Sequence, residues 1–195
     1  MRKTFSAALF FLFFAAASWA QRNEPFSVSV ALWGQPDGLN PLISISALAS
    51  YVQQHLFLPL IDYSPVDGQW RPVLAQALPV VQLVKSGAYK GGMSLSFEIR
   101  KDAKWDNGSD ITAQDVIFTL KALRCPLCQT TALRPYLEFI DAIEIDKTNP
   151  KKFIAYSKKP YFLAEAALGA LPILPEYHYD RDKLMRKFSL ARCAS

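Results

Sequence analysis

Residues 93–123 restrict the possible folds of this chain more than any other segment. Residues 93–100 alternate between apolar and polar side chains, which predicts a half-buried β-strand. After a turn at residues 105–108 (WDNG), Thr112 can begin a helix, because its side chain can accept a hydrogen bond from a free backbone N–H. Asp115 lies in the first turn, where the helix dipole favours an anion. A strand, a turn and a capped helix in succession require a fold that mixes both element types.

Two hairpins and several shorter elements are predicted around this unit. Residues 78–84 precede the strand at 93–100 across a glycine-containing loop, and residues 140–146 precede residues 153–156 across an Asn-Pro turn. We also expect a strand at 26–32, a helix from Ser44 or Ser46 to about residue 57, a strand at 60–63, one helical turn at 72–75, a helix from 161 to about 169, an extended segment at 171–175 and a short helix at 180–188. This order indicates a mixed α/β fold with α+β elements and not a doubly wound repeat.

The first twenty residues have the pattern of a secretory signal peptide. Arg2 and Lys3 precede an almost wholly apolar stretch at residues 5–17, and Ser18 and Ala20 are small residues at the positions that a signal peptidase reads. A membrane anchor is the alternative, but the apolar core is too short to span about 30 Å of hydrocarbon comfortably. We therefore expect cleavage after Ala20 and a soluble, periplasmic protein.

Removal of this segment also lowers the charge. The 195 residues carry a formal net charge of +5, and residues 1–20 contribute two positive charges and no negative ones, so the exported chain has a net charge of +3. The basic pairs at 151–152, 158–159 and 186–187 are separated by apolar or turn residues. Because they form no continuous basic stripe, we do not expect nucleic-acid binding.

Few residues could carry catalysis. His55 and His178 are the only histidines, and neither is accompanied by a nucleophile, zinc or phosphate-loop motif. Glu176, His178 and Asp180 alternate, which could place three metal ligands on one side of a strand, although a polar surface loop is the more frequent structure for such a run. We expect a protein that is not an enzyme and that needs no cofactor or resident metal.

Cys125 and Cys128 form a Cys-x-x-Cys motif after the end of a predicted helix. In an exported chain this pair could be a local disulfide, a redox pair or half of a zinc site. Zinc would need two more ligands, and a redox motif places its first cysteine at a helix N-terminus. We predict a disulfide between Cys125 and Cys128, which leaves the distant Cys193 unpaired.

Aromatic side chains could line a binding pocket. The candidates are Trp33, Trp70, Trp105, Tyr136 and Tyr161. Burial in the core is the alternative, because aromatic residues contribute much of the buried area of a protein.

Three segments carry family-specific motifs. The first is residues 36–41 (PDGLNP), which are followed by a helix and by residues 56–60 (LFLPL). The second and most specific comprises residues 70–75 (WRPVLA), 95–108 (LSFEIRKDAKWDNG) and 112–116 (TAQDV), and the third comprises residues 159–162 (KPYF) and 171–175 (LPILP). In this order they resemble the extracytoplasmic solute-binding proteins of family 5, the peptide and nickel class.

The resemblance implies a periplasmic-binding-protein-like fold of type II with two lobes that close on a ligand. It assigns residues 21–57 and 161–195 to an incomplete first lobe and residues 58–160 to an inserted small α+β subdomain. It also implies a monomer that captures di- or oligopeptides and delivers them to an inner-membrane ABC permease and its ATPase. Relatives in this class also bind nickel chelates, haem or sugars, so these remain alternative substrates.

The resemblance also suggests ligand contacts. Ile45, Ser46 and Ala47 match the stretch that reaches the cleft in oligopeptide binders, and Tyr136 after Pro135 loosely matches an aromatic residue that approaches the peptide. Ser46 could instead cap a helix. Extended peptides are commonly held through their main chain, which leaves side-chain pockets permissive.

The chain is less than half as long as is typical of the resembled family. The second lobe, with the charged residues that hold peptide termini, has no counterpart in the sequence. We therefore expect a fragment, a truncated gene product or a minimal relative, and a non-transporting interaction module is the alternative function.

Overall fold

The computed structural model describes residues 29–187, 189 and 190. The chain divides into two compact units, Met1–Trp33 and Gly34–Ser195. Within the first unit only residues 29–33 are described, so the predicted signal peptide lies outside the described residues. The predicted strand at 26–32 lies partly outside them, and its described part, residues 29–32, forms no strand.

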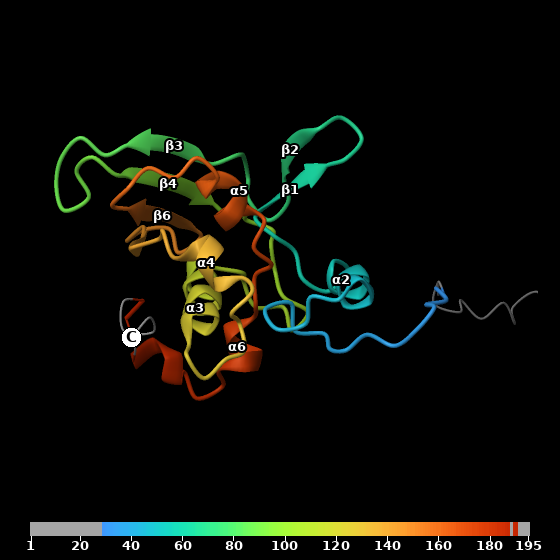
Figure 1. Ribbon diagram of the computed structural model, residues 1–195. Coiled ribbons are helices and arrows are strands. Elements are labelled where there is room, and N and C mark those ends of the chain that lie inside the picture. Colours follow the sequence, from blue (N-terminus) through green and yellow to red (C-terminus); the bar gives the residue numbers. More distant parts are fainter. Residues whose placement is uncertain (1–28, 188, 191–195) are drawn as a thin grey trace, which may run out of the picture. The chain divides into compact units, whose positions relative to one another are not determined.

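The second unit is built around a four-stranded antiparallel sheet with the order β3-β4-β6-β5 (Figure 1). Its strands are β3 (Val80–Leu83), β4 (Met93–Glu98), β5 (Ala142–Ile145) and β6 (Lys152–Ser157). Both predicted hairpins are therefore confirmed. The long-range pairing of β4 with β6 in the middle of the sheet joins the two hairpins.

Alternation along β4 separates the two faces of this sheet. Leu95 and Phe97 are fully buried, whereas the intervening serines are half-buried. Phe97 lies opposite Phe153 of β6, and the two rings stack with centroids 5.5 Å apart. Helix α3 (Ala113–Arg124) lies below the sheet in Figure 1; most of its residues are buried, and its apolar side chains belong to the same core.

The predicted start of α3 is confirmed. Thr112 has an extended backbone and accepts a hydrogen bond from the N–H of Gln114, while Asp115 accepts one from the N–H of Thr112 at 2.9 Å. This reciprocal capping box satisfies N–H groups that have no partner within the helix. The chemistry of four local residues therefore fixes where the helix begins.

The remaining elements are short. They are α2 (Ala47–Gln53), β1 (Ile61–Ser64), β2 (Gln69–Pro72), α4 (Arg134–Leu137), α5 (Ala164–Gly169), α6 (Glu176–Tyr179) and the 3₁₀-helix η2 (Leu184–Lys187). Strands β1 and β2 form a separate two-stranded antiparallel sheet. The predicted helices at 44–57, 161–169 and 180–188 thus exist but are shorter than expected.

The prediction of a helical turn at residues 72–75 is wrong. Pro72 ends β2, and Ala75 forms a bridge to Ile99 while its N–H donates to the carbonyl of Leu60 at 2.9 Å. Leu74 and Ala75 are buried. Extended backbone gives these apolar residues hydrogen-bond partners on two sides, and these tertiary contacts outweigh local helix propensity.

Helix α3 also holds the segment that follows α5. The hydroxyl of Thr119 donates to the carbonyl of Asp115 at 2.8 Å and accepts a hydrogen bond from the N–H of Leu174 at 2.9 Å. The carboxylate of Asp115 accepts a hydrogen bond from the N–H of Glu176 at 3.1 Å. Burial raises the pKa of Asp115, although the hydrogen bonds that its carboxylate accepts from the backbone N–H groups of Thr112 and Glu176 favour the ionised form. These contacts join the two predicted portions 58–160 and 161–195, whose assignment to a subdomain and a lobe stays a prediction.

Substitution Thr119→Val should release residues 174–176 from α3. Valine keeps the shape of the side chain but leaves the buried N–H of Leu174 without its acceptor, which costs about 1–3 kcal/mol. Chemical denaturation should show this loss, and hydrogen exchange should show faster exchange of the Leu174 amide. Thr119→Ser is the control, because it retains the hydroxyl and should retain protection of that amide. Equal protection in both variants would contradict the role assigned to the hydroxyl.

Candidate functional site

The loop before α2 is held together by hydrogen bonds between its polar side chains. Asp37 accepts hydrogen bonds from the hydroxyls of Ser44 and Ser46, both at 2.5 Å. The side-chain amide of Gln53 donates to the carbonyl of Ser44 at 2.9 Å, and both residues are buried. Ser46 is also the N-cap of α2, because its hydroxyl accepts a hydrogen bond from the N–H of Ala49. The loop is thus held by polar contacts in its interior.

Two apolar side chains of the same loop lie at the surface, whereas Leu42 is buried in the core. Ile43 is 47% exposed and Ile45 is 60% exposed, although their neighbour Ser44 is only 6% exposed. Leu56 and Leu58 beyond α2 are also exposed. Single exposed apolar residues are ordinary, but several of them next to a cavity indicate a contact surface.

A cavity of about 540 Å³ adjoins this loop, and we call it the polar cavity. Its walls include Ser44, Ile45, Gln54, His55 and Asp62. Most of its other lining residues are apolar, so the cavity combines apolar side chains with hydroxyl, amide, imidazole and carboxylate groups. Ligand sites commonly have such a mixture, in which a few polar groups orient the ligand.

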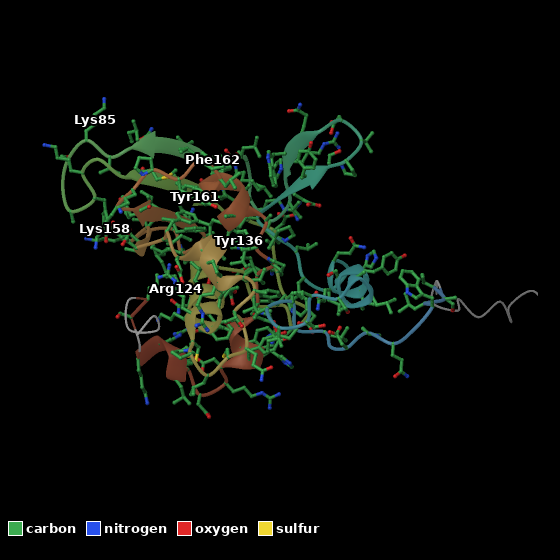
Figure 2. The ribbon with its side chains drawn as sticks, in the orientation of Figure 1. Lys85, Arg124, Tyr136, Lys158, Tyr161 and Phe162 are labelled. Atoms are coloured by element: carbon green, nitrogen blue, oxygen red, sulfur yellow. The ribbon has the colours of Figure 1, made fainter. Side chains whose placement is uncertain are left out.

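A second cavity of about 360 Å³, which we call the apolar cavity, adjoins the polar cavity. It is lined by Trp70, Leu133, Tyr136, Leu137, Tyr161, Leu163, Ala166, Ala167, Ala170, Leu171 and Pro172. Leu133, Ala170 and Pro172 line both cavities. Figure 2 labels Tyr136, which comes from α4, and Tyr161, which precedes α5.

Buried hydrogen bonds fix the walls of the apolar cavity. The guanidinium group of Arg124, at the end of α3, donates to the carbonyl of Leu137 at 2.8 Å and so holds α4 (Figure 2). Pro59 and Pro172 form a bridge, and the N–H of Ile173 donates to the carbonyl of Leu58 at 3.2 Å. One wall therefore depends on a side-chain contact between α3 and α4, and the other depends on backbone contacts between segments that are far apart in sequence.

The structure brings two of the four predicted ligand residues to these cavities. Ile45 lines the polar cavity and Tyr136 lines the apolar cavity. Ser46 serves as the helix cap, and Ala47 is exposed at the first position of α2; neither lines either cavity. A ligand role for all four residues stays a prediction.

Most of the remaining lining residues belong to no sequence motif. Among the aromatic candidates, Trp70 and Tyr161 do line the apolar cavity. Leu133, Ala167 and Ala170 were not singled out, because small and aliphatic residues on short elements carry no motif. The alanines of α5 were the one feature in the sequence that could have indicated space for a ligand at this place.

The predicted alternation of Glu176, His178 and Asp180 does not form a strand. Glu176 and His178 belong to α6, where Glu176 pairs with Arg186 and accepts a hydrogen bond from Gln114. Asp180 accepts hydrogen bonds from the backbone of η2. Burial acts to raise the pKa of Glu176, but the hydrogen bonds and the charge of Arg186 outweigh it and lower this pKa. Among the described residues no cluster of three or more His, Cys, Asp or Glu side chains could hold a metal ion.

The two histidines nevertheless line one cavity. This third cavity, of about 400 Å³, is lined by His55 and His178 together with Trp105, Asp106 and Tyr177. The hydroxyl of Tyr177 donates to the carboxylate of Asp106, and this bond, with the charge of His178 as a minor contribution, lowers the pKa of Asp106. The cavity offers aromatic faces and hydrogen-bonding groups.

The predicted disulfide is not formed in the structure, where Cys125 and Cys128 are free thiols. The guanidinium group of Arg134 donates to the carbonyl of Cys125 at 3.1 Å and to the hydroxyl of Thr130 at 3.2 Å. These hydrogen bonds hold the loop without a covalent link. Burial raises the pKa of the Cys128 thiol, and a hydrogen bond with Cys125 acts in the same direction. Cys193 lies outside the described residues.

Comparison with known proteins identifies similar sequences and folds. A model of the bacterial extracellular solute-binding proteins, family 5, matches residues 79–189. The periplasmic oligopeptide-binding protein OppA of Haemophilus influenzae is 34% identical over 65 residues, which are 33% of this chain and 11% of that protein.

Solved structures show the same fold. The oligopeptide-binding protein from Thermus thermophilus, complexed with a pentapeptide, is 25% identical with a TM-score of 0.55, and the match covers 78% of this chain and 27% of that one. NikZ from Campylobacter jejuni, in complex with Ni(L-His), is 23% identical with a TM-score of 0.59, over 76% of this chain and 27% of that one. The chain thus spans 27% of each of these solved relatives and has the mixed α/β fold of part of a periplasmic binding protein. None of its described helices is long and apolar enough to cross a membrane.

Thiol counting on the exported, unreduced chain should decide the state of the cysteines. Oxidation of Cys125 and Cys128 stays our expectation for an exported protein, and it predicts one reactive thiol per unfolded chain. A bond that closes so short a loop should contribute about 2 kcal/mol to stability, which reduction would remove. Three reactive thiols and an unchanged melting temperature after reduction would contradict the disulfide.

Substitution Asp37→Ala should loosen residues 40–46, because the hydroxyls of Ser44 and Ser46 lose their shared acceptor. Hydrogen exchange of this segment at neutral pH should become faster. Asp37→Asn is the control, because its amide oxygen still accepts a hydrogen bond.

Acid should loosen the same loop in the unmodified chain. The hydrogen bonds from Ser44 and Ser46 hold the pKa of Asp37 below its ordinary value of 3.8. Stabilisation by the carboxylate is therefore complete above that value and is lost as the pH falls through the lower pKa of the folded chain. Exchange that is equally slow in Asp37→Ala and in the unmodified chain would contradict this assignment.

Proposed function

Because the chain belongs to the bacterial extracellular solute-binding proteins of family 5, we propose that it contributes to the capture of di- or oligopeptides outside the inner membrane. The captured peptide would be delivered to an ABC permease with its ATPase, and the exported protein would work in the periplasm as a monomer. Members of this family are solute-binding proteins and not enzymes.

One observation carries the proposal. Ile45, on a loop held by internal hydrogen bonds, presents an exposed apolar side chain to the polar cavity, and this cavity adjoins the apolar cavity that contains Tyr136. Polar groups along the first cavity could pair with the main-chain N–H and C=O groups of an extended peptide. The second cavity offers space for a side chain. Both requirements of peptide binding therefore lie on adjoining surfaces of one compact unit.

A nickel chelate is the second candidate ligand. NikZ, a structural relative, is described in complex with Ni(L-His), and both histidines of this chain line a single cavity. An imidazole side chain is a common ligand for nickel. The peptide proposal has the stronger support, because the described residues place no three metal-ligating side chains together.

Peptide binding should depend on Ile45. A ligand that binds only the folded chain raises its melting temperature, so mixtures of di- to hexapeptides should produce a thermal shift, and calorimetry should then give the affinity of single peptides. Ile45→Asp should weaken binding at least about tenfold, which corresponds to about 1.4 kcal/mol. Val66→Asp is the matched control, because Val66 is a β-branched residue that is 92% exposed and lines neither cavity.

Ni(L-His) in a parallel titration tests the second candidate. A thermal shift with the chelate and none with peptides would favour the nickel chelate. No shift with either would contradict both candidates and favour the alternative that this chain is a non-transporting interaction module.

A further inference from the structure

We infer that the apolar cavity selects peptides with one large apolar side chain, preferably aromatic, and that the backbone of the peptide lies along the polar cavity. This inference rests on the proposed function and adds a substrate class to it. Four observations support it: the chemistry of the cavity walls, their rigidity, the volume of the cavity and its junction with the polar cavity.

None of the described residues that line the apolar cavity has a charged side chain. Trp70, Tyr136 and Tyr161 supply aromatic faces, and leucine, alanine and proline supply the remainder. A charged side chain placed here would lose its hydration and find no partner, which is costly. An aromatic or aliphatic side chain would gain about 25 cal/mol for each Å² of apolar surface removed from water.

The aromatic walls are held by neighbouring rings. Trp70 packs edge-to-face with Tyr63 with centroids 5.5 Å apart, and Tyr161 packs against Phe139 at 4.9 Å. Tyr136 is 59% exposed, but its helix α4 is tied to α3 through Arg124 and the carbonyl of Leu137. A ligand therefore finds walls that are already ordered, and ordering costs are correspondingly low.

The cavity is large enough for an aromatic ring. Its volume is about 360 Å³, whereas an engineered apolar cavity of about 150 Å³ in another protein binds benzene. Ala166, Ala167 and Ala170 line one side of the cavity, and their small side chains leave space for a ligand. A larger residue at any of these three positions would occupy the space. The three alanines therefore favour a ligand with a large side chain.

The junction between the two cavities explains why the guest should be part of a peptide. Leu133, Ala170 and Pro172 belong to both walls, so the two cavities lie next to each other on this unit. The polar cavity supplies the hydrogen-bonding groups of Gln54 and Asp62. A molecule that fills both needs an apolar branch on a polar chain, which is the chemistry of a peptide with a large apolar residue.

Calorimetry with two peptides tests the inference. The tripeptides Ala-Ala-Ala and Ala-Phe-Ala differ only in the predicted guest, and we expect the second to bind the unmodified chain at least about tenfold more tightly. Ala167→Phe should fill the cavity and reduce this preference to less than about threefold, while Ala-Ala-Ala still binds. Ala88→Phe is the matched control, because Ala88 lies on an exposed loop away from both cavities and should leave the preference unchanged.

Indole serves as an independent probe of the apolar cavity. Saturation-transfer NMR should detect indole bound to the unmodified chain and to Ala88→Phe, and no binding to Ala167→Phe. Indole binding without peptide binding would mean that the proposed function fails although the cavity accepts aromatic rings. Equal affinity for the two tripeptides in the unmodified chain would overturn the inference and leave peptide capture standing, even if Ala167→Phe does not fold. Binding of neither indole nor peptides would overturn both.

Discussion

The hydroxyl group of Thr119 joins the sheet-and-helix core to the surface that carries the cavities. It satisfies the buried N–H of Leu174 while it donates to its own helix, and Asp115 repeats the connection one turn earlier at Glu176. An unpaired backbone N–H at this depth would be costly, so the segment at 171–176 has little freedom to move away. Pro172 of this segment forms a bridge with Pro59, and both prolines line the polar cavity.

Local chemistry explains which elements could be predicted from the sequence. The two hairpins and the start of α3 depend on alternation, turn residues and a capping box that lie within a few residues of one another. Residues 72–75 and 176–180 were predicted incorrectly because their backbone is set by distant partners, Leu60 and Ile99 in the first case and Asp115 in the second. No local pattern contains those partners.

The candidate site was predictable to a similar extent. The family motifs pointed to Ile45 and Tyr136, and both residues line cavities. The same motifs could not decide whether Ser46 caps a helix or contacts the ligand. The inward turn of Ser44 and the outward turn of Ile45 depend on Asp37 and Gln53, which satisfy the polar groups of the loop from opposite sides. The alanines of α5 contribute to the apolar cavity because their small side chains leave space. A cavity forms only when distant segments pack together, so no local sequence pattern predicts it.

The bridge between Pro59 and Pro172 has a consequence for the order of folding. More than one hundred residues separate its two sides, and the cavity walls come from segments near residues 45, 70, 135 and 165. A chain that emerges with its N-terminus first can form the β1–β2 hairpin, the β3–β4 hairpin and α3 before residue 172 is available. Closure of so long a loop is slow compared with the formation of local hairpins. The surface that we assign to ligand capture therefore depends on contacts of long sequence separation, and a chain that ends before residue 172 lacks one side of this bridge.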